Sequence, residues 1–351
     1  MKTGWGHIRA AQALEEYAKN NLPQIKVDHV DLRAIEPRLG KFFELFYDVA
    51  NDYLPLVWGA VYQTFDKPPV SAAFRKTGGF QRVFSRRIGR YLKKEAPDGV
   101  IFTNVIPAPM VAPCCKKIFP DVPLAAVVTD YHGHAYYNVP AIDRYFAPAL
   151  EVKDDLVRAG VCENKIEASG MPLGKKFYCR YNSGAIKKNL GIKNNFKTAL
   201  FISRLDKEFI VPALRGILEK NRQLNLIMIC GGNNEVYQKV KNEIGESLNF
   251  KLINWTGRLD EYMKIADVVV SKPGGLIISE CLALGKPIVM TDPIPGQEEK
   301  NAEFIARRGY GKMALSAKEI AAAVEEELLS PSKIAKIDAA NACAKIFEIF
   351  V

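Results

Sequence analysis

A pair of glycines at the start of a predicted helix is the feature of the sequence that most directly indicates chemistry. In "VVVSKPGGLIISECLALG" a buried strand is predicted to end at Ser271, and a helix follows Pro273, Gly274 and Gly275. Backbone N–H groups at a helix N-terminus, with no side chains in front of them, bind anions such as phosphate. Glu280, on the first turns of that helix, suits two vicinal hydroxyls, as on a ribose. Close packing alone also explains many such turns.

The next loop, "DPIPGQEEKNAEF", carries amide and carboxylate side chains in front of another predicted helix. Gln297, Glu298 and Asn301 follow its Pro-Gly turn. These side chains offer donors and acceptors in fixed directions, which is what recognition of sugar hydroxyls requires. The alternative is ordinary capping of the helix by Gln297 and Glu298.

Histidines near two predicted turns are candidates for acid–base chemistry at neutral pH. His7 follows "GWG" directly and precedes an amphipathic helix, whereas His132 and His134 lie in "TDYHGHAYY", after a predicted strand that ends at Asp130. A His-x-His pair can bind a metal ion, but no third ligand is evident in the sequence, so a role in lining the site is favoured. His29, in "VDHVDL", is expected to be structural.

Composition indicates a folded protein of two domains. The 351 residues are 48% hydrophobic and 25% charged, and they exceed the size of one ordinary core. The seven cysteines show no Cys-x-x-Cys spacing and are expected to be reduced thiols, so neither a disulfide scaffold nor a metal site is predicted. No apolar run reaches about 18 residues, and no secretion signal is expected.

The net charge of +10 is concentrated in two stretches. Residues 75–94 hold eight basic and no acidic residues, interleaved with apolar ones, and residues 168–205 again hold eight basic and no acidic ones. Residues 41–65 place apolar side chains on one face of a predicted helix that Pro55 ends or kinks. Core burial or solvated surface explains each stretch alone. Together, 41–65 and 75–94 predict docking on anionic membrane lipids, and the lack of any nucleic-acid-binding motif predicts no nucleic-acid partner.

Apolar runs alternate with amphipathic segments through both halves of the chain. Strands are predicted at 26–32, 99–105, 124–130, 144–148, 198–204, 225–232, 250–257, 268–275 and 286–292. This alternation predicts an α/β fold of two doubly wound, Rossmann-like domains that face a cleft. An N-terminal domain of residues 1–170, on which 335–351 can pack, precedes a linker, 171–197, and a C-terminal domain, 198–334.

The order of these motifs resembles one family. "SKPGGL…SE…ALGKP" followed by "PIPGQEEKNA" resembles the donor-binding half of the monogalactosyldiacylglycerol synthases and processive diacylglycerol glucosyltransferases. "GWGH" followed by "RAAQAL", and "VVTDY" with a downstream "SGMPLGKKF", resemble the N-terminal half of the same family. The resemblance covers nearly the whole chain. It implies the GT-B fold of glycosyltransferase family 28 and a metal-independent, inverting transfer of a hexose from a UDP-sugar, without a cofactor.

The resemblance also implies roles for individual residues. On the donor side, Gly231, Gly232 and Asn233 would line the nucleotide cleft, Gly257, Arg258 and Leu259 would hold the uracil edge, Pro273, Gly274 and Gly275 would lie at the diphosphate, Glu280 would hold the ribose, and Gln297, Glu298 and Asn301 would select the hexose. On the acceptor side would lie Gly4, Trp5, Gly6, His132 and His134. Trp5 departs from the small residue that is commoner at its position.

The first loop of the C-terminal domain also departs from the family, which has a glycine-rich loop there. This chain has "FISRLDKEF", which resembles the signature of another GT-B branch in which Arg and Lys contact the donor diphosphate. By that resemblance, Arg204 and Lys207 are predicted to stabilise the leaving diphosphate. Plain surface charge is the alternative.

The transfer needs a base that takes the proton of the acceptor hydroxyl as it attacks the anomeric carbon. His7 matches the histidine of the family's Gly-x-Gly-His motif and is predicted to be the base or an acceptor ligand. Asp130 is predicted to orient a histidine or to be the base itself. UDP-glucose or UDP-galactose is the expected donor and diacylglycerol the expected acceptor, and the enzyme is expected to be cytoplasmic and peripheral on the inner face of the cell membrane.

Alternatives remain open at this point. They are an N-acetylglucosamine transferase acting on a polyprenyl-linked cell-wall precursor, a UDP-sugar 2-epimerase of similar fold, and an inactive lipid- or nucleotide-binding module. The sequence does not distinguish glucose from galactose, or one added sugar from several. In the family a central strand precedes the Gly-x-Gly-His loop, so the native product is expected to begin roughly ten residues upstream, and without that strand a slot is expected in the N-terminal sheet.

Overall fold

The computed structural model describes residues 6–37, 55–76, 79–204, 207–221, 223–245, 249–335, 337 and 339–350. The chain forms two compact units. The first consists of Met1–Lys175, Ile294–Lys300 and Asp338–Val351, and the second of Lys176–Pro293 and Asn301–Ile337. Residues 294–300, which the sequence analysis assigns to the C-terminal domain, therefore pack with the first unit.

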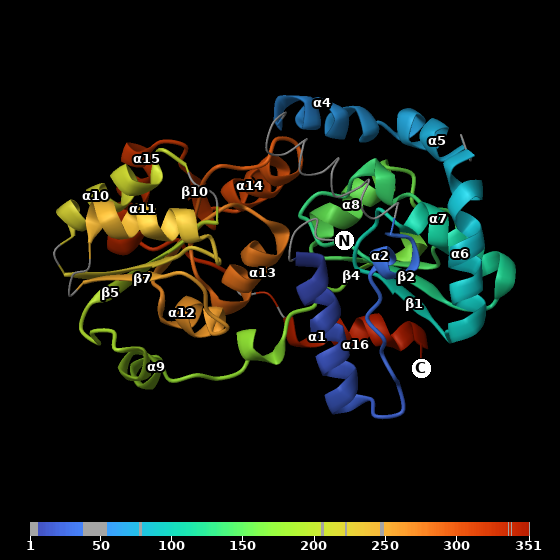
Figure 1. The fold of residues 1–351 in the computed structure, drawn as a ribbon, viewed down its shortest axis with the longest axis horizontal. Helices are drawn as coiled ribbons and strands as arrows, with labels where there is room; N and C mark the ends of the chain where they lie inside the picture. Colours follow the sequence, from blue (N-terminus) through green and yellow to red (C-terminus); the bar gives the residue numbers. More distant parts are fainter. Residues whose placement is uncertain are drawn as a thin grey trace. The chain divides into compact units, whose positions relative to one another are not determined.

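The first unit is built on a parallel sheet (Figure 1). Its helices, 3-10 helices (η) and strands are α1 (Gly6–Asn21), α2 (Leu32–Ile35), α4 (Pro55–Phe65), α5 (Pro68–Lys76), α6 (Gly79–Glu95), β1 (Val100–Phe102), α7 (Ala108–Ile118), β2 (Leu124–Val127), η2 (Ala135–Tyr137), β3 (Arg144–Ala147), α8 (Leu150–Arg158), η3 (Glu163–Lys165), β4 (Ile166–Ala168), α16 (Ala339–Phe347) and η5 (Glu348–Phe350). The strands pair in the order β1-β2-β3-β4. Every residue of β2 is buried, as in a parallel sheet that is covered on both faces.

The strand predicted at 26–32 is wrong. Residues 26–31 are irregular, Leu32 begins α2, and none of the described strands pairs with this segment. Lys26 and Asp28 form an ion pair in solvent, and Val30 is 42% exposed. Alternation of apolar and polar residues makes a strand only where a neighbour supplies backbone partners. The residues before Gly6 lie outside the described ones, so the expected slot in the sheet stays a prediction.

The end of the chain returns to its beginning. Figure 1 shows α16, near the red end of the ribbon, beside the blue α1. Buried Cys343, Ile346 and Phe347 pack with residues of α1 in one cluster, where the rings of Phe347 and Tyr17 stack with their centroids 5.9 Å apart. The position of α1, which begins one residue before His7, is thus fixed by a helix more than 300 residues away in the sequence.

The second unit is built on a larger parallel sheet in the order β10-β9-β8-β5-β6-β7. Its elements are η4 (Lys175–Phe177), α9 (Ser183–Leu190), β5 (Lys197–Ile202), α10 (Ile210–Lys220), β6 (Leu224–Ile229), α11 (Asn234–Ile244), β7 (Phe250–Ile253), α12 (Leu259–Ile265), β8 (Val268–Ser271), α13 (Gly275–Leu284), β9 (Ile288–Met290), α14 (Gln297–Arg307), β10 (Gly311–Met313) and α15 (Ala317–Leu329). The strand order reverses between β5 and β8, which marks a doubly wound sheet. The predicted α/β class is confirmed.

The apolar segment around Pro55 is described only from Pro55 onward. Pro55 is the first residue of α4, where a proline costs no helical hydrogen bond. The predicted apolar face formed by residues 42–54 lies outside the described residues. Among the residues that the structure describes, no helix is both long and apolar enough to cross a bilayer.

Candidate functional site

Two loops of the second unit follow its sheet at the point where the strand order reverses. β5 pairs with β6 on one side and with β8 on the other, and ligands of such sheets bind outside the carboxyl ends of the strands at this point. Arg204 and Lys207 follow β5, and Lys272, Pro273 and Gly274 follow β8. The structure therefore places the two predicted phosphate-binding loops after adjacent strands.

The N-terminus of α13 is not capped by a side chain of its N-cap residue. Gly274 is the N-cap residue in an extended conformation, and it supplies no side chain to occupy the first N–H groups. The loop before α13 is fixed by a side chain of α14, because the fully buried Asn301 donates from Nδ2 to the Pro273 carbonyl at 3.0 Å. The Asn301 amide is thus directed at the loop, where it fixes the backbone that would meet a phosphate.

Two lysines share one carboxylate beside this helix. Asp292 lies 3.3 Å from Lys207 Nζ and 3.1 Å from Lys272 Nζ, through different carboxylate oxygens. Its backbone adopts a positive φ of 48°, which turns the loop after β9 back toward both lysines. The three side chains carry a net positive charge next to the N-terminus of α13. Sequence reasoning singled out Lys207 but gave no role to Lys272 or Asp292.

Glu280 is buried within α13, with only 1% of its surface exposed. Together with burial of the thiol, which is the larger effect, its carboxylate raises the pKa of the adjacent Cys281. A ribose could reach this carboxylate only after a side-chain rearrangement, so the predicted ribose contact is not preformed.

The loop after β6 is tied to the loop after β5. Asn233 is the N-cap of α11, where its side chain accepts from Glu235 N at 2.9 Å and donates from Nδ2 to the Arg204 carbonyl at 2.8 Å. Gly231 has a positive φ of 59°, and a side chain there would collide with the aliphatic part of Arg204. Asn233 thus holds the Arg204 backbone, and Gly231 leaves room for the Arg204 side chain.

The predicted uracil loop follows β7. Arg258 pairs with Glu261 through hydrogen bonds of 2.8 and 2.6 Å, and Leu259 begins α12. Sequence reasoning missed Trp255, although a large aromatic residue next to Gly257 is a visible signal. Trp255 is 70% exposed and lies beside both Gly232 and Gly257, where neither neighbour covers it with a side chain.

In the first unit, His7 is held in one tautomer. Its Nδ1 lies 2.8 Å from the Thr103 carbonyl and 2.8 Å from Thr129 Oγ1. Because a carbonyl can only accept, Nδ1 carries the hydrogen and the lone pair lies on Nε2. Burial lowers the pKa of His7 below its ordinary value, although the Asp130 carboxylate and the Thr103 carbonyl favour the protonated form. A neutral imidazole whose lone pair lies on Nε2 can act as a base.

The loop of residues 294–300 contacts Asp130. Gln297 donates from Nε2 to Asp130 Oδ2 at 2.8 Å. Glu298 accepts from Ile294 N at 2.8 Å and Glu299 accepts from Gly296 N at 2.8 Å, so both carboxylates cap the turn before α14. In this structure Glu298 therefore has the capping role that the sequence left as an alternative.

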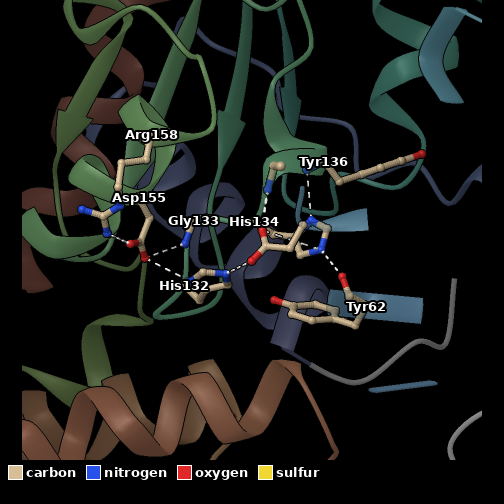
Figure 2. A network of polar contacts seen from close by, with 9 residues as sticks. Tyr62, His132, Gly133, His134, Tyr136, Asp155 and Arg158 are labelled. Carbon is tan, nitrogen blue, oxygen red and sulfur yellow. Dashed lines mark hydrogen bonds and ion pairs between the residues drawn. The ribbon is translucent and has the colours of Figure 1, made fainter. Parts of the chain in front are cut away.

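The two histidines of the His-Gly-His loop have different hydrogen-bonding partners (Figure 2). His132 lies between Asp155, 3.1 Å from Nδ1, and Asp66, 2.8 Å from Nε2. Burial alone would lower the pKa of His132, but these two carboxylates raise it to about 9. His134 donates from Nε2 to the Tyr62 carbonyl at 2.9 Å and accepts from Tyr136 N, and burial lowers its pKa.

Both ring nitrogens of His132 are thus engaged by carboxylates. Among the described residues, no group of three or more histidine, cysteine, aspartate or glutamate side chains is arranged to hold a metal ion. Of the predicted acceptor-side residues, Gly6 begins α1, whereas Gly4 and Trp5 lie outside the described residues.

Two family models match successive parts of the chain. Residues 7–173 match the family model of monogalactosyldiacylglycerol synthase, and residues 182–342 match that of glycosyl transferases group 1. A processive diacylglycerol beta-glucosyltransferase of Staphylococcus carnosus is 28% identical over 89% of this chain and 78% of its own length. The chain is thus similar to glycosyltransferases over most of its length.

Solved structures show that this chain has the GT-B fold. A glycosyltransferase from Rickettsia africae superposes with a TM-score of 0.55 at 14% identity, covering 97% of this chain and 93% of its own. A UDP-GlcNAc 2-epimerase from Neisseria meningitidis superposes with a TM-score of 0.58 at 16% identity, covering 77% and 81%. Because a transferase and an epimerase share this fold, the fold alone does not distinguish the two reactions.

Proposed function

We propose that the protein transfers a hexose from a UDP-sugar to the hydroxyl of diacylglycerol, with inversion at the anomeric carbon. The observation that carries the proposal is His7, whose Nδ1–H is fixed by the Thr103 carbonyl so that Nε2 can accept a proton. The names of the curated relatives, processive diacylglycerol beta-glucosyltransferases, support the acceptor and favour glucose over galactose as the sugar.

In the proposed reaction, His7 Nε2 removes the hydroxyl proton as the acceptor oxygen attacks the anomeric carbon. The bond from that carbon to the diphosphate breaks, and UDP leaves with the electron pair. Lys207, Lys272 and the N-terminus of α13 would stabilise the charge that develops on the diphosphate. Fixed cations of this kind do the work for which other transferases use a divalent metal, so we propose neither metal nor cofactor.

On the donor side, the exposed ring of Trp255 offers an apolar surface for the flat uracil base beside the backbone of Gly257 and Arg258. Gln297 and Glu298 would contact hexose hydroxyls, for which Glu298 must leave its capping bond or share it. Glu280 would reach the ribose only after a side-chain rearrangement.

We propose that the protein acts as a peripheral enzyme on the cytoplasmic face of the membrane. Helix α6 buries Ile88 and Leu92 on one side and exposes Arg86, Arg90 and Lys93 on the other. An exposed basic helix face is attracted by anionic lipid head groups, and salt weakens that attraction. Binding to vesicles of anionic phospholipid that falls steeply between low and high salt would support this part of the proposal. Salt-independent binding would contradict it.

The experiment that tests the proposed activity is incubation of the purified protein with labelled UDP-glucose or UDP-galactose and diacylglycerol vesicles. A labelled glycolipid supports the proposal, and the better donor identifies the hexose. Isomerised nucleotide sugar without glycolipid would instead indicate an epimerase, and nucleotide binding without any product would indicate a binding module. Replacing diacylglycerol by a polyprenyl-linked acceptor tests the cell-wall transferase reaction.

A further inference from the structure

Helix α4 contacts both the His132–His134 loop and the turn that leads to Gln297. His134 donates to the Tyr62 carbonyl at 2.9 Å, and the two rings lie with centroids 4.3 Å apart (Figure 2). One turn earlier on the same helix, a methyl group at Gly59 would come within 2.9 Å of Pro295 Cβ. The helix is therefore packed against the turn so closely that Gly59 has no room for a side chain.

The same turn is covered a second time by Tyr62. A methyl group at Gly296 would lie 2.8 Å from Tyr62 Cδ1, and the positive φ of 83° at Gly296 is one that glycine adopts without strain. Gln297 follows Gly296 directly and begins α14. The turn that precedes α14 thus packs against the face of α4 that carries Gly59 and Tyr62.

The C-terminal end of α4 is anchored to the body of the first unit. Asp66, the residue after α4, accepts from Ala135 N at 2.9 Å and lies 2.8 Å from His132 Nε2. His132 is bound in turn by Asp155 of α8. An imidazolium between two carboxylates is a strong, directional link when all three groups are partly buried.

We propose that α4 is a clamp that positions Gln297 against Asp130, with Gly59, Tyr62 and Asp66 as positioning residues. The proposal rests on the proposed function, in which Gln297 contacts the hexose and Asp130 lies beside the base. The clamp holds the Pro295–Gly296 turn so that the Gln297 amide reaches Asp130 at 2.8 Å. Since α4 is the C-terminal part of the segment 41–65 that is expected to meet lipid, it would connect that segment to the amide proposed to bind the sugar.

Gly59→Ala tests the clamp. Alanine has a higher helix propensity than glycine, so the helix itself should remain, but the added methyl group would collide with Pro295. We expect kcat/KM for the UDP-hexose to fall about tenfold, since small displacements of a positioning group are costly. The affinity for UDP alone should change less than about twofold. Gly89→Ala on α6 is the matched control, because a methyl group there meets Cys114 Sγ at an ordinary 3.5 Å. An unchanged kcat/KM in Gly59→Ala would overturn the proposal.

A double-mutant cycle with Gln297→Ala separates the clamp from a general structural effect. If α4 acts through Gln297, Gly59→Ala should cost less than about twofold once the amide is gone. A loss as large as in the wild-type background would show that α4 acts on something else, and the proposal would fail while the proposed function stood.

Hydrogen exchange gives a readout that does not need activity. In Gly59→Ala, the amides of residues 294–300 should exchange at least about fivefold faster than in Gly89→Ala, because their covering helix is displaced. Equal exchange would overturn the clamp even if the wild-type protein made no glycolipid. If no glycolipid forms but exchange is faster in Gly59→Ala, the proposed function is rejected, whereas the packing of α4 against residues 294–300 is supported.

Discussion

Gln297 and Asp130 are 167 positions apart in the sequence, yet the Gln297 amide donates to the Asp130 carboxylate at 2.8 Å within the first unit. The same carboxylate favours the protonated form of His7. Asp130 therefore interacts both with Gln297, which is predicted to bind the sugar, and with His7, which is predicted to be the base. Removing the charge of Asp130 tests this link.

Asp130→Asn should move the acidic limb of the pH dependence of kcat/KM to lower pH. The wild-type carboxylate raises the pKa of His7 against the effect of burial, so its loss should lower that pKa further. The asparagine oxygen can still accept from Gln297. Asp143→Asn, which removes the remote ion pair with Lys116, serves as the control and should leave the limb in place. An identical limb in both variants would exclude Asp130 as the partner of His7.

His7→Gln should lower kcat by about 10²- to 10⁴-fold, because the group that accepts the hydroxyl proton is removed. UDP affinity, measured by calorimetry, should stay within about twofold, since the proposed nucleotide loops lie in the second unit. The exposed His29 provides a control, and His29→Gln should retain full activity. Full activity of His7→Gln would assign the proton transfer to another group.

The local strand-turn-helix pattern was sufficient to predict the phosphate loop. β8 ends at Ser271 and α13 begins at Gly275, as the sequence indicated, because an apolar run, a Gly-Gly turn and a helix are local features. The sequence does not predict β4 and β10, because a polar residue, Glu167 or Lys312, is the middle residue of each and leaves no apolar run. These strands exist because neighbouring strands supply their hydrogen-bonding partners.

The parts of the site that the sequence did not predict depend on contacts between distant segments. Asp292 bridges Lys207 and Lys272 only because its positive φ and the order of the strands bring three loops together. Similarly, the sequence predicts a core or lipid-facing helix in the segment 41–65, but it gives no sign that Gly59 and Tyr62 in the described part of this segment contact the loop of residues 294–300. The spacing of apolar residues identifies which face of a helix is apolar, but it does not identify the segment that packs against that face.

Lys272→Ala and Lys207→Ala should each raise the KM for the UDP-sugar and lower kcat, with a combined loss of kcat/KM of at least about 100-fold. The reason is that both ammonium groups lie next to the N-terminus of α13, where a diphosphate would be bound. Lys220→Ala is a matched control, because Lys220 also pairs with a carboxylate, Glu325, in the second unit. Steady-state kinetics in which the lysine pair behaved like Lys220 would remove it from the donor site.

Trp255→Ala should weaken binding of UDP by about tenfold, while Trp255→Phe should recover most of that loss. The exposed ring lies beside Gly232 and Gly257 and offers a flat apolar surface at the predicted uracil loop. Fluorescence quenching of Trp255 by UDP in the Trp5→Phe and Trp58→Phe background gives a direct readout. No quenching together with unchanged affinity in Trp255→Ala would place the base elsewhere.

His132 should make the stability of the first unit depend on pH in the alkaline range. Its carboxylate partners, Asp66 and Asp155, raise the pKa against the effect of burial from 6.5 in the unfolded chain to about 9 in the folded one. The charged histidine therefore stabilises the fold fully below about pH 6.5, and this contribution is lost as the pH rises through about 9. Scanning calorimetry, which resolves separate transitions of two units, should show a fall of about 1–3 kcal/mol across this range in the wild type. The fall should be absent in His132→Gln and retained in His29→Gln. Equal pH dependence in all three proteins would mean that the link between α4 and α8 is not charged.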